Sequence, residues 1–270
     1  MKTLALSALA ALSFLAGSVQ AQTAFRPPAV PLVTHDPYFS VWSMGDQLAG
    51  DWPKHWTGAA MGMTGMVRID GKAYRWCGPE PRDVPAMKQT SVKVEATSTT
   101  YTFEAGGVQF GVVFATDMPV DDLAAASRPT TWVLVTTAAT DGKPHEATVY
   151  LDVSGEWVTN SPDQRVTWDR KKQGGAEVLS MASVDQKVLE RAGDGVRIDW
   201  GRMYLAAESG AGVAHMAVAG HNTARSGFAG KGELPAKDDA RKPRAANDDW
   251  PVMAATAKLD PTGGTIQAFF

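Results

Sequence analysis

Apolar and polar side chains alternate along most of this chain, as they do in strands with one buried and one wet face. Val108, Phe110, Val112 and Phe114 share one face of such a stretch. Similar short patterns recur throughout the chain. We predict strands at 66–69, 74–76, 91–95, 101–104, 108–114, 131–137, 145–153, 164–169, 196–200, 202–207, 213–218, 253–259 and 265–270.

Turn signals separate these strands. Asp70-Gly71 lies between two apolar runs, and such pairs favour hairpin turns because both central residues need positive φ. Gly106-Gly107 and residues 141–144 interrupt the pattern in the same way. Consecutive strands joined by tight turns indicate antiparallel pairing.

Helical periodicity is rare in the mature chain. Val184, Val188 and Leu189 recur at helical spacing and Gly193 follows them, so we predict a helix over Ser183 to Ala192. A single helical turn is expected within 121–127. Many short strands with one short helix and no βαβ rhythm predict an all-β antiparallel β-sandwich with long loops.

Residues Pro27 to Tyr74 follow a different pattern, rich in aromatic side chains and in proline. The prolines lack a donor N–H and fix φ, which excludes a continuous helix. The segment is expected to be extended and kinked, a shaped surface carried on a scaffold built elsewhere.

The first residues have the pattern of an export signal. Lys2 precedes the apolar run Leu4 to Ala16, which is short of the ~20 residues of a membrane span. Small residues around Ala21 suit signal-peptide cleavage. We predict a signal peptide at 1–21, an extended aromatic segment at 22–80 and a β-sandwich at 81–270, the last two forming one unit in a secreted or periplasmic protein.

Composition narrows the classes of partner. The chain has 270 residues, 44% of them hydrophobic, and a net charge of −3. This balance gives no reason to expect a nucleic-acid partner, or a membrane partner after signal cleavage. Cys77 is the only cysteine, so an internal disulfide is excluded. We expect it to be a small buried side chain beside Trp76.

Local motifs for metals and cofactors are lacking. The five histidines show no ligand spacing, and neither a phosphate-binding loop nor a nucleophile elbow is present. No metal or cofactor is therefore predicted. Carboxylates that hydrolytic chemistry would need are present, but their convergence is left open by the sequence. These are Asp36, Asp46, Asp51, Asp121, Asp122, Asp152 and Glu156.

The most specific local cluster is Trp52 to Gly58, in which two indoles flank His55. One interpretation is a stacking surface for a sugar or other flat ligand, with His55 donating a hydrogen bond. The other is an aromatic plug that packs inside the protein. We take Asp36, Trp52, His55 and Trp56 as the candidate substrate-binding residues, with the catalytic residues unknown.

Several long motifs carry a family resemblance. The runs RPPAVPLVTHDPYFSVWS, DWPKHWTG and MTGMVRIDGKAYRWCG resemble the N-terminal region of the glutaminase A family, the fungal-type extracellular glutaminases and their bacterial relatives. The likeness extends through 110–129, 141–145, 150–157 and 197–205. It covers nearly all of the mature chain.

The resemblance implies more than the residues alone show. Members carry a β-sandwich followed by a helical barrel of the six-hairpin glycosidase type, and hydrolyse L-glutamine to L-glutamate and ammonia. We expect this chain to stop before that barrel, to be inactive alone, and to bind its amino-acid or sugar substrate together with the missing domain. The alternatives are an accessory domain of a glycoside hydrolase, a stand-alone carbohydrate-binding module and a purely structural part.

Overall fold

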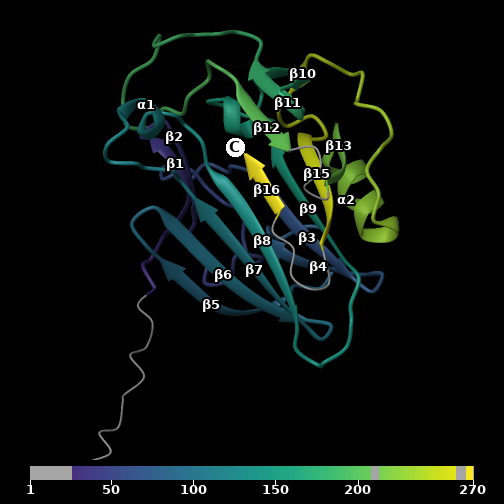
Figure 1. Cartoon of the computed structure of the whole chain (residues 1–270). Helices are drawn as coiled ribbons and strands as arrows, with labels where there is room; N and C mark the ends of the chain where they lie inside the picture. The colour runs from purple at the N-terminus through teal and green to yellow at the C-terminus, as the bar shows by residue number, and fades with distance from the viewer. Residues whose placement is uncertain (1–25, 208–212, 260–265, 270) are drawn as a thin grey trace, which may run out of the picture.

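Two large antiparallel sheets pack face to face in the protein, and a separate two-stranded sheet accompanies them (Figure 1). The computed structural model describes residues 26–207, 213–259 and 266–269. The smaller sheet has the strand order β13 (Val213–Gly220), β15 (Pro251–Leu259), β9 (Ala147–Ser154), β3 (Met63–Ile69) and β4 (Lys72–Cys77). The predicted antiparallel β-sandwich is therefore confirmed.

The larger sheet has nine strands, in an order that is not the order of the chain. It runs β14 (Arg244–Ala245), β10 (Arg165–Gln173), β11 (Ala176–Ser183), β12 (Met203–Ala207), β16 (Ile266–Phe269), β8 (Trp132–Ala139), β7 (Val108–Ala115), β6 (Ser98–Ala105) and β5 (Lys88–Val94). Strand β16 fills the position between β12 and β8, so the last described residues join the two halves of this sheet.

The main core lies between the sheets. Inward and outward positions alternate in strands such as β7, where Phe110 and Phe114 are buried beside exposed or half-buried neighbours. Leu151 and Met253 contribute from the smaller sheet. Cys77 is fully buried, as the sequence predicts, and burial raises the pKa of its thiol.

A second, smaller core covers the outer face of the five-stranded sheet. Helix α2 (His221–Lys231) packs there, with Phe228 5.0 Å from the ring of Tyr150. Strand β9 is therefore buried on both faces, which explains why all its residues except Thr148 are buried. The sequence analysis did not predict this helix.

The aromatic N-terminal segment forms a hairpin and loops. Strands β1 (Val30–Asp36) and β2 (Phe39–Ser43) pair with each other, and Thr99 of β6 donates a hydrogen bond to Pro31 O at 2.7 Å. The extended character of the segment was predicted, but this pairing was not. Strands β3 and β4 from the same segment belong to the five-stranded sheet.

Several turn and strand predictions are confirmed. Asp70 and Gly71 join β3 to β4 with φ of 49° and 82°, and Gly106 and Gly107 join β6 to β7 with φ of 56° and 77°. The predicted helical turn is α1 (Leu123–Ala126), with the Asp122 side chain accepting from Ala125 N–H.

Two predictions are wrong. Residues 184–192 are turns and irregular chain rather than a helix, and Val188 and Leu189 are exposed instead of forming an apolar face. Residues 196–200 are not a strand. This segment is held in place by Arg197 instead. Its guanidinium donates hydrogen bonds to main-chain carbonyls, and these bonds keep the segment across the end of the smaller sheet.

The predicted signal peptide at 1–21 lies outside the described residues. Within the part of the chain that is described, no helix has the length and apolar character needed to cross a membrane.

Candidate functional site

Three of the four predicted site residues meet at the turn between β1 and β2. The carboxylate of Asp36 accepts hydrogen bonds from the backbone N–H groups of Tyr38 at 2.7 Å and Phe39 at 3.1 Å. The carbonyl of Pro37, in the same turn, accepts from the side chains of His55 and Trp56. The extended loop 51–60 is thereby fastened to the hairpin.

His55 is committed to internal contacts. Its Nε2 lies 3.0 Å from Pro37 O, a pure acceptor, so Nε2 carries the proton and donates. Nδ1 then accepts from the Thr57 hydroxyl at 2.9 Å. The side chain is fully buried, and burial lowers its pKa, which favours this neutral tautomer.

Trp56 is the exposed member of the cluster. Its side chain is 46% exposed, and its Nε1–H donates to Pro37 O at 2.6 Å. The imidazole of His55 lies 5.4 Å away. The indole is therefore held in place at its polar edge while one part of the ring remains open to solvent.

Trp52 belongs to a different cluster. Its ring lies 5.0 Å from that of Trp250, and the guanidinium of Arg225 lies 5.1 Å from its centroid. Trp52 and Trp250 are both half-buried, and the contacts of Trp52 are the cation–π and tilted aromatic arrangements that stabilise packed side chains. The two tryptophans singled out in the sequence thus have different surroundings.

Arg225 anchors helix α2 to strand β9. It donates to the two oxygens of Asp152 at 2.8 and 3.0 Å, and the Tyr150 hydroxyl donates to the same carboxylate at 2.6 Å. Burial acts to lower the pKa of Arg225, but Asp152 outweighs burial and raises it. Asp152, one of the carboxylates left open by the sequence, is therefore the buried half of an ion pair.

Glu156 is the second buried carboxylate at this end of β9, in the 3-10 turn η1 (Gly155–Val158). Burial raises its pKa, and the charge of Arg197 acts in the opposite direction. Arg197 itself donates to the carbonyls of Ala60 at 3.1 Å and Asn160 at 2.8 Å. The Oε2 atom of Glu156 has no hydrogen-bond partner.

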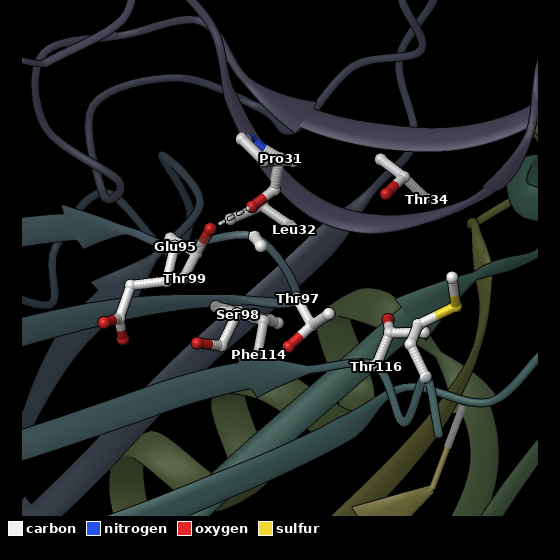
Figure 2. Close-up of a pocket in the computed structure, with 11 residues that line it drawn as sticks. Pro31, Leu32, Thr34, Glu95, Thr97, Ser98, Thr99, Phe114 and Thr116 are labelled. Carbon is white, nitrogen blue, oxygen red and sulfur yellow. Dashed lines mark hydrogen bonds between the residues drawn. The ribbon is translucent and has the colours of Figure 1, made fainter. Parts of the chain in front are cut away.

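A pocket of about 240 Å³ opens between β1 and the turn that joins β5 to β6 (Figure 2). Its walls carry hydroxyl groups and apolar side chains, including Thr34, Thr97 and Phe114. Glu95 is the one ionisable group in its lining, and it pairs with Lys93 at 2.7 Å. The pocket therefore offers hydrogen bonding but no acid–base pair.

Two further hollows occur on the surface. One of about 340 Å³ includes Arg75 and Gln89, and one of about 540 Å³ includes Arg202 and Tyr204. None of these three pockets is lined by the four predicted site residues. Among the described residues, no group of three or more histidine, cysteine or acidic side chains is arranged to hold a metal ion.

Sequence reasoning missed Arg225, Arg197 and Trp250. A signal was available for the first, because Asp152 lies between Leu151 and Val153 in a mainly apolar strand and a buried carboxylate needs a partner. The partner follows 73 positions later, and nothing in the local pattern identifies it. The substrate-binding role of Asp36, Trp52, His55 and Trp56 stays a prediction.

The fold and these contacts define an all-β sandwich domain whose buried carboxylates hold its elements together. The chain belongs to the family described as "Domain of unknown function (DUF5127)", whose model matches residues 97–270. Residues 7–88 match a second model, "Domain of unknown function (DUF4964)".

Two curated relatives carry glutaminase names. The chain is 31% identical over 260 residues to "Glutaminase A" of Aspergillus oryzae, an alignment that covers 93% of this chain and 37% of the relative. It is 24% identical over 279 residues to "Probable glutaminase/05536" of Arthroderma benhamiae, covering 94% and 30%. The resemblance to the glutaminase A family is confirmed, and the chain spans about a third of the length of these relatives.

Proposed function

We propose that this chain is the N-terminal β-sandwich of a secreted glutaminase A-like hydrolase, and that a helical barrel domain outside it supplies the catalytic groups. The whole protein would hydrolyse L-glutamine to L-glutamate and ammonia. The similarity to glutaminase A over 93% of the chain is the observation that carries the proposal.

The burial of Asp152 and Glu156 favours a structural role for the sandwich. Hydrolysis by general acid and base needs two carboxyl groups that face one cavity. Asp152 is fully buried beneath Arg225, and Glu156 is 6% exposed. Neither lines the three pockets described above. The sandwich would position the second domain and lend the β1–β2 turn, with Trp56, to one wall of the substrate cleft.

The alternative of a stand-alone carbohydrate-binding module rests on Trp52 and Trp56 acting as one platform. The geometry supports it less, because Arg225 and Trp250 occupy the surroundings of Trp52. Trp56 alone offers an exposed indole. A titration of the chain with a panel of oligosaccharides is expected to leave its tryptophan fluorescence unchanged; quenching that Trp56→Ala abolishes would favour the alternative.

The activity is tested with the protein encoded by the complete gene, including any sequence after Phe270. Purified protein is incubated with L-glutamine, and ammonia and L-glutamate are measured. Stoichiometric release of both is expected. Release of a sugar from glycosides, with no turnover of L-glutamine, would contradict the proposed activity and favour a glycoside hydrolase.

A further inference from the structure

The two ends of the sandwich differ in chemistry. At one end, the short polar turns of β3–β4 and β6–β7 lie beside the 140–146 segment that leads into β9; we call this the hairpin end. His145 there bonds to Asp70 at 2.6 Å and to Asp141 at 2.9 Å. A charged network of this kind is typical of a surface that faces water.

At the opposite end, called the loop end, lie the β1–β2 turn, the β7–β8 loop (116–131) and the β11–β12 loop (184–202). Ala206 of β12 and Trp132 of β8 both pair with Phe269 of β16, so the loops that precede β12 and β8 leave the larger sheet in the same direction. Ile198 N–H donates to Tyr38 O at 2.9 Å, which links the third segment to the first. Figure 1 shows α1, the β1–β2 hairpin and the arching β11–β12 loop at this end.

Exposed apolar side chains concentrate at the loop end. Among the described residues, ten large apolar side chains are exposed, and eight of them belong to these three segments or to Trp56 beside the β1–β2 turn. Val120 is 99% exposed, Leu123 84% and Leu189 74%. Helix α1 is made of one leucine and three alanines and buries none of them.

The three segments form one connected surface. The His35 ring on β1 lies 3.3 Å from the Thr131 hydroxyl, which in turn lies 3.2 Å from the hydroxyl of Thr116. These bonds join the hairpin to both ends of the β7–β8 loop. Exposed apolar patches of this kind mark interaction sites, because isolated soluble proteins keep contiguous apolar surface small.

The direction of strand β16 indicates what covers this surface. Its residue Phe269 pairs with Trp132, the first residue of β8, so the strand runs toward the loop end (Figure 1). The curated relatives are about three times longer than the aligned region. A segment continuing from β16 would emerge among the exposed apolar loops.

We propose that the loop end is the docking surface for the domain that completes the glutaminase-like protein. The existence of that domain rests on the proposed function. The new element is the location of its contact surface on the sandwich. The β7–β8 and β11–β12 loops contribute the apolar contacts through Leu123 and Leu189. The pocket beside Thr34 and Met118 lies at the same end and would receive a side chain of the docked domain.

Hydrogen–deuterium exchange tests the location. Exchange is measured in the protein encoded by the complete gene and in the chain ending at Phe270. Peptides covering 116–131 and 184–202 are expected to exchange at least about tenfold more slowly in the complete protein. Peptides covering 140–146 and the β6–β7 turn should exchange equally in both. Equal exchange at the loop end, or protection confined to the hairpin end, would overturn the proposal.

Variants of the complete protein give a second test. Leu123→Asp combined with Leu189→Asp is expected to abolish the protection of both loops. Met44→Asp changes an exposed apolar side chain outside the loop end and serves as the matched control, with protection retained. Unchanged exchange in the hairpin-end peptides shows that the sandwich remains folded. Full protection in the double variant would contradict the proposal.

The two proposals fail separately. Turnover of L-glutamine by a complete protein whose loops are unprotected would leave the activity standing and overturn the docking surface. Protected loops in a complete protein that does not turn over L-glutamine would support the docking surface and overturn the proposed activity. A stop codon directly after Phe270 in the gene would remove the second domain and overturn both.

Discussion

Arg225 of helix α2 and Asp152 of strand β9 form a bidentate ion pair inside the protein, with N–O distances of 2.8 and 3.0 Å. The pair joins the outer helix to the centre of the five-stranded sheet, and Tyr150 completes the set of donors to the carboxylate. The pair stabilises the packing of the helix on the sheet. Removing either partner would leave the other charge buried without an opposite charge beside it, which is strongly destabilising.

Arg225→Ala is expected to lower the free energy of unfolding by about 3–5 kcal/mol. Asp152→Ala should have a similar effect, and the double variant should lose less than the sum of the two. Urea denaturation followed by fluorescence provides the measurement. Lys93→Ala, which removes an exposed ion pair with Glu95, is the control and should leave the midpoint unchanged. Additive losses in the double variant would show that the pair is not coupled.

Glu156 gives a pH dependence of known sign. Burial raises its pKa above the ordinary 4.5, so the folded state binds the proton more tightly than the unfolded state. Stability from this group is fully present below pH 4.5 and is lost as pH rises through the raised pKa. Glu156→Gln is expected to be more stable relative to wild type at pH 7.5 than at pH 4.5, measured by urea denaturation at both values. A constant difference would contradict the raised pKa.

His145 gives a second pH dependence, through a charged network at the hairpin end. The hydrogen bonds that His145 donates to the carboxylates of Asp70 and Asp141 raise its pKa above 6.5, and the same bonds lower the pKa of both carboxyl groups below 3.8. The histidine contribution is present below pH 6.5 and is lost as pH rises through the raised value. The carboxylate contributions are present above pH 3.8 and are lost in more acidic solution.

The three groups therefore support the fold together between pH 3.8 and 6.5. His145→Gln should destabilise the protein more at pH 5.5 than at pH 8.5, as read from thermal midpoints at the two values. His215, whose Nε2 bonds to the Pro235 carbonyl instead of a carboxylate, offers the control His215→Gln. An equal loss at both pH values for His145→Gln would exclude the charged network.

Trp52 and Trp56 are expected to respond differently to truncation. Trp52→Ala removes the contacts with Arg225 and Trp250 and should cost on the order of 2 kcal/mol of stability. Trp56→Ala removes a half-exposed ring and should cost less than about 1 kcal/mol. Chemical denaturation of the two matched variants provides the comparison. Equal losses would show that the two rings contribute alike to packing.

The local patterns of the sequence predicted the strands and turns well. In Val108 to Phe114 every second residue is large and apolar, and in Asp70-Gly71 the residue types suit positive φ, so neighbouring residues carry all the information that these elements need. The antiparallel sandwich follows from such elements. The order of the nine-stranded sheet does not, since β16 enters between β8 and β12 through long-range pairing.

Tertiary contacts decided what the sequence analysis missed or misplaced. Val184, Val188 and Leu189 have helical spacing, but all three side chains are exposed and their segment is held by Gln186 and Arg197 instead. Trp52 and Trp56 look equivalent in the sequence. Their different surroundings depend on Arg225 and Trp250, about 170 to 200 positions away, which no local pattern could indicate.

We propose that the catalytic groups of the complete protein lie outside this chain. The most direct measurement is ammonia release from L-glutamine by purified residues 22–270, alongside the protein encoded by the complete gene. This proposal predicts turnover by the complete protein and none by the chain alone. Turnover by residues 22–270 would contradict it and place the catalytic groups within the sandwich.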